Sequence, residues 1–140
     1  FESVVHEIVE ATSGWWKLKG PVARDDIHRV LIGIVRAYRP HARLMAAAFD
    51  AATHDPMLRP MIDGFVDGSA AELRRHIRAG QQQGWIEPGV DPATMSVQLT
   101  WLAERTMNRM LPGAPDAAVR RIEDSYTDIV FRTLYATGGS

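Results

Sequence analysis

The chain has 140 residues, which favours a single domain, and its 46% hydrophobic and 24% charged residues are typical of a soluble globular protein. Its net charge of −1 argues against nucleic-acid binding by this segment, because binding phosphates usually needs a basic surface. Cysteine is absent, which excludes disulfides and thiolate metal sites and is compatible with the cytoplasm. No apolar run approaches the roughly 18 residues of a membrane helix, so we expect no membrane as a partner.

Two helices are predicted at the start of the chain. Apolar residues follow helical spacing from Phe1 to about Trp16. This stretch begins without a capping residue, so we expect further residues upstream of Phe1. A second helix is expected from a cap at Asp25 or Asp26 to about Tyr38, where it ends because the next residue precedes a proline.

A short helix and a long helix are predicted next. Residues 41–53 are rich in alanine and predict a short third helix, whereas the fourth extends from residue 56 to about 83. At 1.5 Å per residue the fourth helix would be roughly 40 Å long. Gly64 and Gly68 lie in its middle, where each glycine costs about 1 kcal/mol relative to alanine. A packing contact, a cavity or a plain kink would explain that cost.

The fifth predicted helix, residues 91–111, has apolar residues on two sides. Asp91 caps its start, and Pro112 with Gly113 ends it. A surface helix normally has one apolar stripe, so the second side is expected to be buried as well, against another copy of the protein. The last helix, from residue 115 to about 135, has the same character. No strand pattern appears, and the sequence predicts an all-α fold of about six helices.

Several sequence features coincide with those of one protein family. They are the short alanine-rich helix, the long helix ending at Gly84, and the loop with Pro88 before a proline-led helix. The most specific are LTWLAERT at residues 99–106 and DIVFRTLY at residues 128–135. Over nearly the whole chain, the pattern resembles the C-terminal ligand-binding and dimerisation domain of TetR-family transcriptional repressors. Within that family it is most similar to the subgroup of the mycobacterial ethionamide-resistance repressor.

The resemblance implies a function for the chain. Residues 1–140 would form the effector-binding and dimerisation domain of a bacterial, cytoplasmic repressor. A helix-turn-helix domain upstream of Phe1 would bind operator DNA, and residues 1–16 would link it to the body. A small, largely apolar effector in the core would shift this linker helix and release the DNA, with no cofactor and no catalysis.

The resemblance also implies a ligand pocket that differs from the pocket of the subgroup. An aromatic residue of the subgroup is replaced by His28, two tryptophans by Ile62 and Ser69, and a ligand-binding asparagine by Ala103. We therefore do not carry over the preferred ligand. The polar groups expected to contact a ligand belong to His28, Tyr38 and Thr100. The other expected lining residues are Ile32, Val35, Phe49, Met61, Ile62, Phe65, Trp101, Ala103 and Met107.

The last two helices would form an intermolecular four-helix bundle in a homodimer. The expected interface residues are Met95, Leu99, Leu102, Met110, Ile122, Tyr126, Ile129 and Thr133. Trp101 is compatible with the pocket, with this interface or with an ordinary core. Glu104 and Arg105 could place a charge at the pocket mouth, but interhelical salt bridges are favoured because an unpaired charge in an apolar pocket is costly.

Two alternative functions stand beside a ligand sensor. The first is an enzyme built on a helical bundle, which would need convergent catalytic or metal-ligating residues. His6 and Glu7 begin a zinc-helix pattern, but Glu10 stands where the second histidine is required. The second is a helical dimerisation module with a filled core and no ligand, which composition alone does not distinguish from a sensor.

Overall fold

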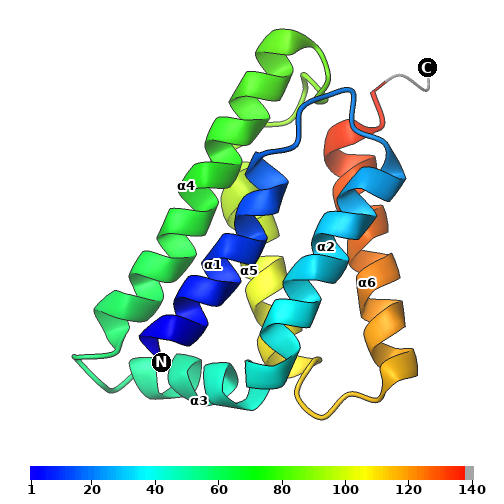
Figure 1. Ribbon diagram of the computed structural model, residues 1–140. Helices are drawn as coiled ribbons and strands as arrows, with labels where there is room; N and C mark the ends of the chain where they lie inside the picture. Colours follow the sequence, from blue (N-terminus) through cyan, green and yellow to red (C-terminus); the bar gives the residue numbers. More distant parts are fainter. Residues whose placement is uncertain (138–140) are drawn as a thin grey trace.

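A computed structural model describes residues 1–137, so the last three residues of the expected domain lie outside it. The described residues contain helices and no strand, which confirms the predicted all-α class (Figure 1). A 3₁₀ turn, Arg39–His41, precedes the third helix, and a π-helical turn, Phe131–Tyr135, continues the last one. The α-helices are α1 Glu2–Trp16, α2 Arg24–Tyr38, α3 Ala42–Ala52, α4 Arg59–Gln83, α5 Pro92–Arg109 and α6 Asp116–Val130.

The starts of three helices are set by aspartate side chains. Asp91 accepts a hydrogen bond from the Thr94 N–H at 3.0 Å, which confirms the predicted cap of α5. Helix α2 begins before the expected caps, because the Asp26 carboxylate accepts the Ala23 N–H at 2.9 Å from inside the first turn. Helix α4 begins later than predicted, since Asp55 accepts the backbone N–H of Met57 at 2.8 Å in a preceding turn.

Helix α1 lies between α2 and α4 and packs against both of them (Figure 1). The long α4 spans the molecule beside α1, and α5 lies behind α1 and contacts α4. Helix α6 packs beside α2, and α3 crosses one end of the bundle. Within residues 1–137, no helix combines the length and the apolar character that crossing a bilayer requires.

The C-terminal end of α1 is held by a buried hydrogen-bond chain. The Trp15 Nε1–H donates to the Tyr135 hydroxyl at 2.8 Å. That hydroxyl lies 2.6 Å from His76 Nε2 on α4. A neutral imidazole has one N–H, and His76 donates it to the Trp16 backbone, so Nε2 accepts the Tyr135 proton. The Tyr135 phenol thus joins α1 and α4 to the turn Phe131–Tyr135.

Burial sets the protonation state of His76, which is 5% exposed. Loss of water lowers the pKa of the imidazole to about 4, and a hydrogen bond with the Trp16 backbone opposes this shift. The ring is therefore neutral at neutral pH, as its acceptor role toward Tyr135 requires.

Gly80, near the end of α4, allows the following loop to fold back onto the helix. A Cβ atom at this position would lie 2.5 Å from the side chain of the buried Ile86. In contrast, a Cβ atom at Gly64 or Gly68 would meet nothing within 4 Å. Packing therefore explains the glycine at position 80, whereas the two central glycines border open space.

We predict that His76 makes the stability of the fold depend on pH. Between about pH 6.5 and pH 4 the unfolded chain binds a proton at His76 that the folded chain excludes. The free energy of unfolding should therefore fall by about 3 kcal/mol as the pH is lowered through this window. Urea unfolding midpoints at several pH values measure the effect. His76→Gln should flatten the slope, whereas the exposed-site control His54→Gln should keep it; equal slopes for all three proteins would contradict the assignment.

Alanine substitutions should have opposite effects at two glycines of α4. Gly80→Ala should destabilise the fold by roughly 1 kcal/mol or more, because forcing Ile86 aside costs more than the gain in helix propensity. Gly68→Ala should stabilise it by about 0.5–1 kcal/mol, since the new methyl group meets no neighbour. Chemical denaturation measures both changes, and a stabilised Gly80→Ala protein would be inconsistent with the close approach.

Candidate ligand cavity

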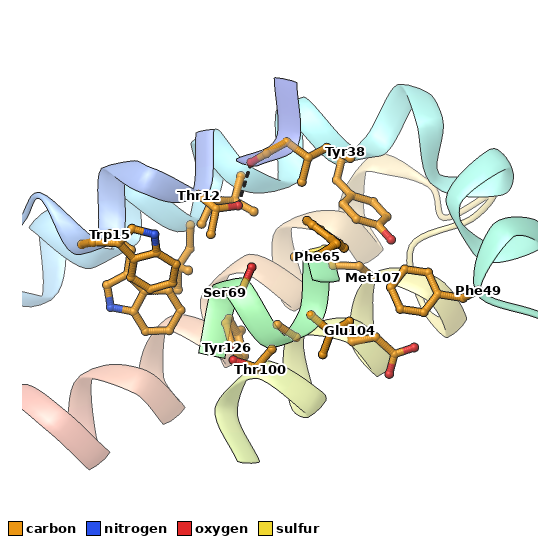
Figure 2. A pocket seen from close by; sticks show the side chains of 16 residues that line it. Thr12, Trp15, Tyr38, Phe49, Phe65, Ser69, Thr100, Glu104, Met107 and Tyr126 are labelled. Atoms are coloured by element: carbon orange, nitrogen blue, oxygen red, sulfur yellow. Dashed lines mark hydrogen bonds between the residues drawn. The ribbon is translucent and has the colours of Figure 1, made fainter. Parts of the chain in front are cut away.

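A cavity of about 80 Å³ lies in the middle of the bundle (Figure 2). All of the α-helices contribute to its wall. The lining residues are Ile8, Thr12, Trp15 and Trp16 of α1; Leu31, Ile34 and Tyr38 of α2; Phe49 of α3; Phe65, Val66 and Ser69 of α4; Thr100, Ala103, Glu104 and Met107 of α5; and Tyr126 of α6. No lysine, arginine or histidine occurs among these lining residues.

Aromatic rings form much of the cavity wall. Phe49 and Phe65 meet edge to face, with ring centroids 6.3 Å apart. Trp15 stacks on Trp16 at 5.4 Å and receives the edge of Tyr126 at 6.4 Å. Figure 2 shows Trp15 at one end of the cavity and Phe49 at the other. The wall therefore suits an elongated apolar ligand with at least one aromatic contact at each end.

The volume limits what the cavity holds in this conformation. One water occupies about 30 Å³ of liquid, and an apolar cavity of about 150 Å³ is known to take benzene. A void of 80 Å³ lies between these values. A ring-sized ligand therefore requires some side chains to move, and the half-buried Trp16 is well placed to do so.

Polar groups gather at one end of the cavity. The Tyr38 O–H donates to the Asn108 side-chain oxygen, and the Asn108 amide donates to Glu104 Oε1 at 3.3 Å. Burial raises the pKa of Tyr38, and the nearby Glu104 carboxylate also raises it, so the phenol is neutral. Figure 2 shows Phe49, Glu104 and the Tyr38 hydroxyl toward the same end of the cavity. The salt bridge expected for Glu104 does not form within residues 1–137.

Four further hydroxyl groups line the cavity, and two of them are committed to the backbone. Thr12 donates to the Ile8 carbonyl at 2.7 Å, and Tyr126 donates to the Leu99 carbonyl at 2.9 Å. Ser69 and Thr100 also line the wall, and their hydroxyls form no hydrogen bond with another group of the described chain. These two hydroxyls are therefore available to a ligand.

A surface groove between α1 and α4 adjoins the cavity. Its own residues include Val9, Gly64 and Gly68, and it shares Thr12, Trp16, Phe65 and Ser69 with the cavity wall. The two glycines leave this groove open, because a Cβ at either position would project into unoccupied space. Of the explanations considered for these glycines, proximity to a cavity fits best. The groove and the cavity are therefore separated by the side chains that they share.

Several residues expected at the pocket do line the cavity. They come from α2, α3, α4 and α5, and the cavity brings them together from distant parts of the sequence. They are Tyr38, Phe49, Phe65, Thr100, Ala103 and Met107.

Trp101, also expected at the pocket, lies outside the cavity and is 61% exposed. Successive residues of an α-helix differ by about 100° in direction. Because Thr100 faces the cavity, Trp101 points away from it, toward solvent. Two-sided apolar patterning therefore located the helix correctly but not the direction of this side chain.

The other expected pocket residues that lie outside the cavity occur on α2 and α4. His28, Ile32 and Val35 line a surface groove between α2 and α6, where His28 pairs with Asp124 at 3.0 Å. Met61 is partly exposed on α4. Ile62 is buried in a separate small cluster between α3 and α4, so it faces α3 rather than the cavity.

The wall formed by α1 is the part of the site that the sequence did not predict. Its helical spacing marked Ile8 and Trp15 as inward-facing, but not what they would face. Ser69 and Glu104 were named at the pocket in the sequence, Ser69 as the replacement of a subgroup tryptophan and Glu104 as a possible charge at the pocket mouth, and both line the cavity. Glycines at positions 64 and 68 were the available sequence signal that α4 borders open space.

The residues expected at a dimer interface divide into two groups. Leu99, Ile122 and Tyr126 are buried within the monomer, and Met95 and Thr133 are half-buried. Exposed apolar side chains remain at Leu102, Met110 and Ile129, with 37%, 59% and 41% of their surfaces accessible. The exposed three border one groove between α5 and α6, whose floor includes Ile122 and Tyr126.

The described residues hold no group of three or more histidine or acidic side chains arranged to bind a metal. Comparisons with curated proteins and with solved structures return no significant match. A comparison with family models matches residues 27–136 to the C-terminal domain of the transcriptional regulator EthR. Because this match covers most of an all-α chain, the chain belongs to that family, whose members are domains of transcriptional regulators and not enzymes.

Proposed function

We propose that this chain is the effector-binding and dimerisation domain of a TetR-type repressor of the bacterial cytoplasm. The observation that carries the proposal is an apolar cavity whose wall includes α1, in a chain of a regulator family. A ligand-free module with a filled core fits this observation less well. Operator DNA would be bound by a helix-turn-helix domain joined to α1 upstream of Phe1, and two copies would bind together.

The position of the cavity beside α1 suggests how ligand binding would change DNA binding. Helix α1 contributes Ile8, Thr12, Trp15 and Trp16 to the wall, so a ligand larger than the present void pushes against it. The Trp15 end of α1 is held by Tyr135. Displacement is therefore directed to the opposite, N-terminal end, where the DNA-binding domain would be attached. Ligand binding would favour conformations in which the two DNA-binding domains are wrongly spaced.

The α5–α6 surface is the proposed dimer interface. Exposed Leu102, Met110 and Ile129 surround an elongated groove on this surface, and the exposed Trp101 lies next to Leu102 on α5. A cluster of large apolar side chains on a surface typically marks a contact with another protein. Two copies related by a two-fold axis would cover this cluster with α5 and α6 of each partner, as a four-helix bundle.

Small apolar ligands should stabilise the fold by binding the cavity. Benzene, toluene or indole in excess should raise the melting temperature by a few degrees, because a ligand that binds the folded state shifts the unfolding equilibrium. Ala103→Phe should fill the void and abolish the increase. The control Ala47→Phe, on the exposed surface of α3, should retain it. No increase with any of the three ligands would count against a ligand-binding cavity.

Charge introduced at the α5–α6 surface should dissociate the proposed dimer. Leu102→Glu would bury a carboxylate without a partner at the interface, so sedimentation equilibrium should change from a dimer to a monomer. Leu44→Glu is the matched control, because Leu44 is 47% exposed on α3, away from the groove. A Leu102→Glu protein that stays dimeric would place the interface elsewhere.

A further inference from the structure

We propose that the ligand of this cavity carries a protonated amine, which binds Glu104, and an apolar body, which extends along Phe65 toward Trp15. The inference rests on the proposed function, since it concerns the ligand of the same cavity. Beyond the proposed function, it specifies that the ligand bound by this cavity is positively charged. The evidence is the distribution of charge and of hydrogen-bonding capacity along the cavity wall.

Glu104 is the one lining residue that carries a formal charge at neutral pH, among the residues that the structure describes. The wall contains no lysine, arginine or histidine. Burial raises the pKa of Tyr38 and of Tyr126, so both phenols stay neutral. Among the lining side chains, the formal charge is therefore negative and confined to Glu104.

The Glu104 carboxylate has hydrogen-bonding capacity left for a ligand. A carboxylate can accept about four hydrogen bonds, and the protein supplies one, the 3.3 Å bond from Asn108. Tyr38 does not supply another, because its proton is already donated to Asn108. Glu104 is half-buried, and no arginine, lysine or histidine of residues 1–137 pairs with it. The Glu104 carboxylate can therefore accept further hydrogen bonds from a ligand.

The groups around Glu104 suit an ammonium group better than other head groups. An ammonium has three donors, and the free carboxylate oxygen of Glu104 and the Tyr38 hydroxyl oxygen, each with two lone pairs, can accept them. Phe49 also lines the cavity, and an aromatic face attracts a cation. A hydroxyl head group has one donor and no charge, so it gains less. A carboxylate head group meets a like charge and finds no cationic partner.

The rest of the cavity explains why the amine should carry an apolar body. The other lining residues carry no formal charge, and most of them, such as Phe65, Leu31 and Trp15, are apolar or aromatic. A free ammonium ion gains little from this surface and loses hydration. An alkyl or aryl body removes apolar surface from water, which offsets that loss.

Three matched four-carbon compounds test the charge preference: n-butylamine, 1-butanol and butyrate, which at about pH 7 are cationic, neutral and anionic. Methyl NMR of the methionines reports binding, because Met107 lines the cavity whereas Met57 is 82% exposed and serves as an internal reference. n-Butylamine should shift the Met107 signal with a dissociation constant roughly tenfold lower than that of 1-butanol, and butyrate should bind more weakly still.

Two variants assign the preference to Glu104. Glu104→Gln keeps an acceptor for Asn108 and removes the charge, so it should raise the dissociation constant of n-butylamine about tenfold and leave that of 1-butanol unchanged. Asp67→Asn makes the same change in net charge at an exposed site on α4 and should leave both values unchanged. Loss of the preference in both variants would indicate general attraction to the protein and would overturn the inference.

The outcomes separate this inference from the proposed function. Binding of 1-butanol and n-butylamine with equal affinity, or tighter binding of butyrate, would overturn the amine preference while the apolar cavity stands. A Glu104→Gln protein that keeps the wild-type preference would also overturn it. Absence of a Met107 shift with all three compounds would contradict both the amine preference and the proposed ligand-binding cavity.

Discussion

The rest of the structure depends on an apolar space that the bundle leaves unfilled beneath α1. Protein interiors are normally close-packed, and a void costs about 24 cal/mol per Å³. For 80 Å³ the cost is about 2 kcal/mol, a noticeable part of the stability of a domain. Side chains larger than Ala103 or Ser69 would remove it. A ligand that fills the space recovers the lost contacts, so the void itself supplies free energy for binding.

In the proposed function, this free energy would act on α1, a helix that is anchored at its Trp15 end. Trp15 is fixed by Tyr135, and through it by the neutral His76. A ligand larger than the void would move α1 relative to this anchor, and the movement would reach the DNA-binding domain proposed at the other end of the helix.

The sequence predicted the elements of this fold better than their orientations. Helical spacing and caps such as Asp91 located the helices to within a few residues, because these signals are local. The direction of one side chain depends on the register of packing between helices, and an error of one residue rotates it by about 100°. That rotation separates Thr100 in the cavity from Trp101 at the surface. The helical spacing of apolar residues also indicated that α1 is buried on one side. It did not indicate that part of this side borders a cavity.

Glu104 illustrates a second limit of sequence reasoning. The rule that a charge avoids an apolar pocket favoured a salt bridge, and for most sequences that expectation is sound. Here the carboxylate is only half-buried, accepts one hydrogen bond from Asn108 and has no cationic partner within residues 1–137. The rule concerns fully desolvated charges. It does not apply to a carboxylate that is partly exposed to solvent at the edge of a cavity. Departures of this kind concentrate at binding sites because a ligand completes them.

Helix α5 joins the two proposed activities through its contact with α6. Thr100, Ala103 and Met107 face the cavity, whereas Leu102 and Met110 border the outer groove. Tyr126 belongs to both surfaces, since it lines the cavity, forms part of the groove floor and donates to the Leu99 carbonyl. A ligand that presses on Tyr126 therefore presses on the underside of the proposed interface. Dimer affinity and ligand affinity should then be linked, and by reciprocity each would alter the other by the same factor.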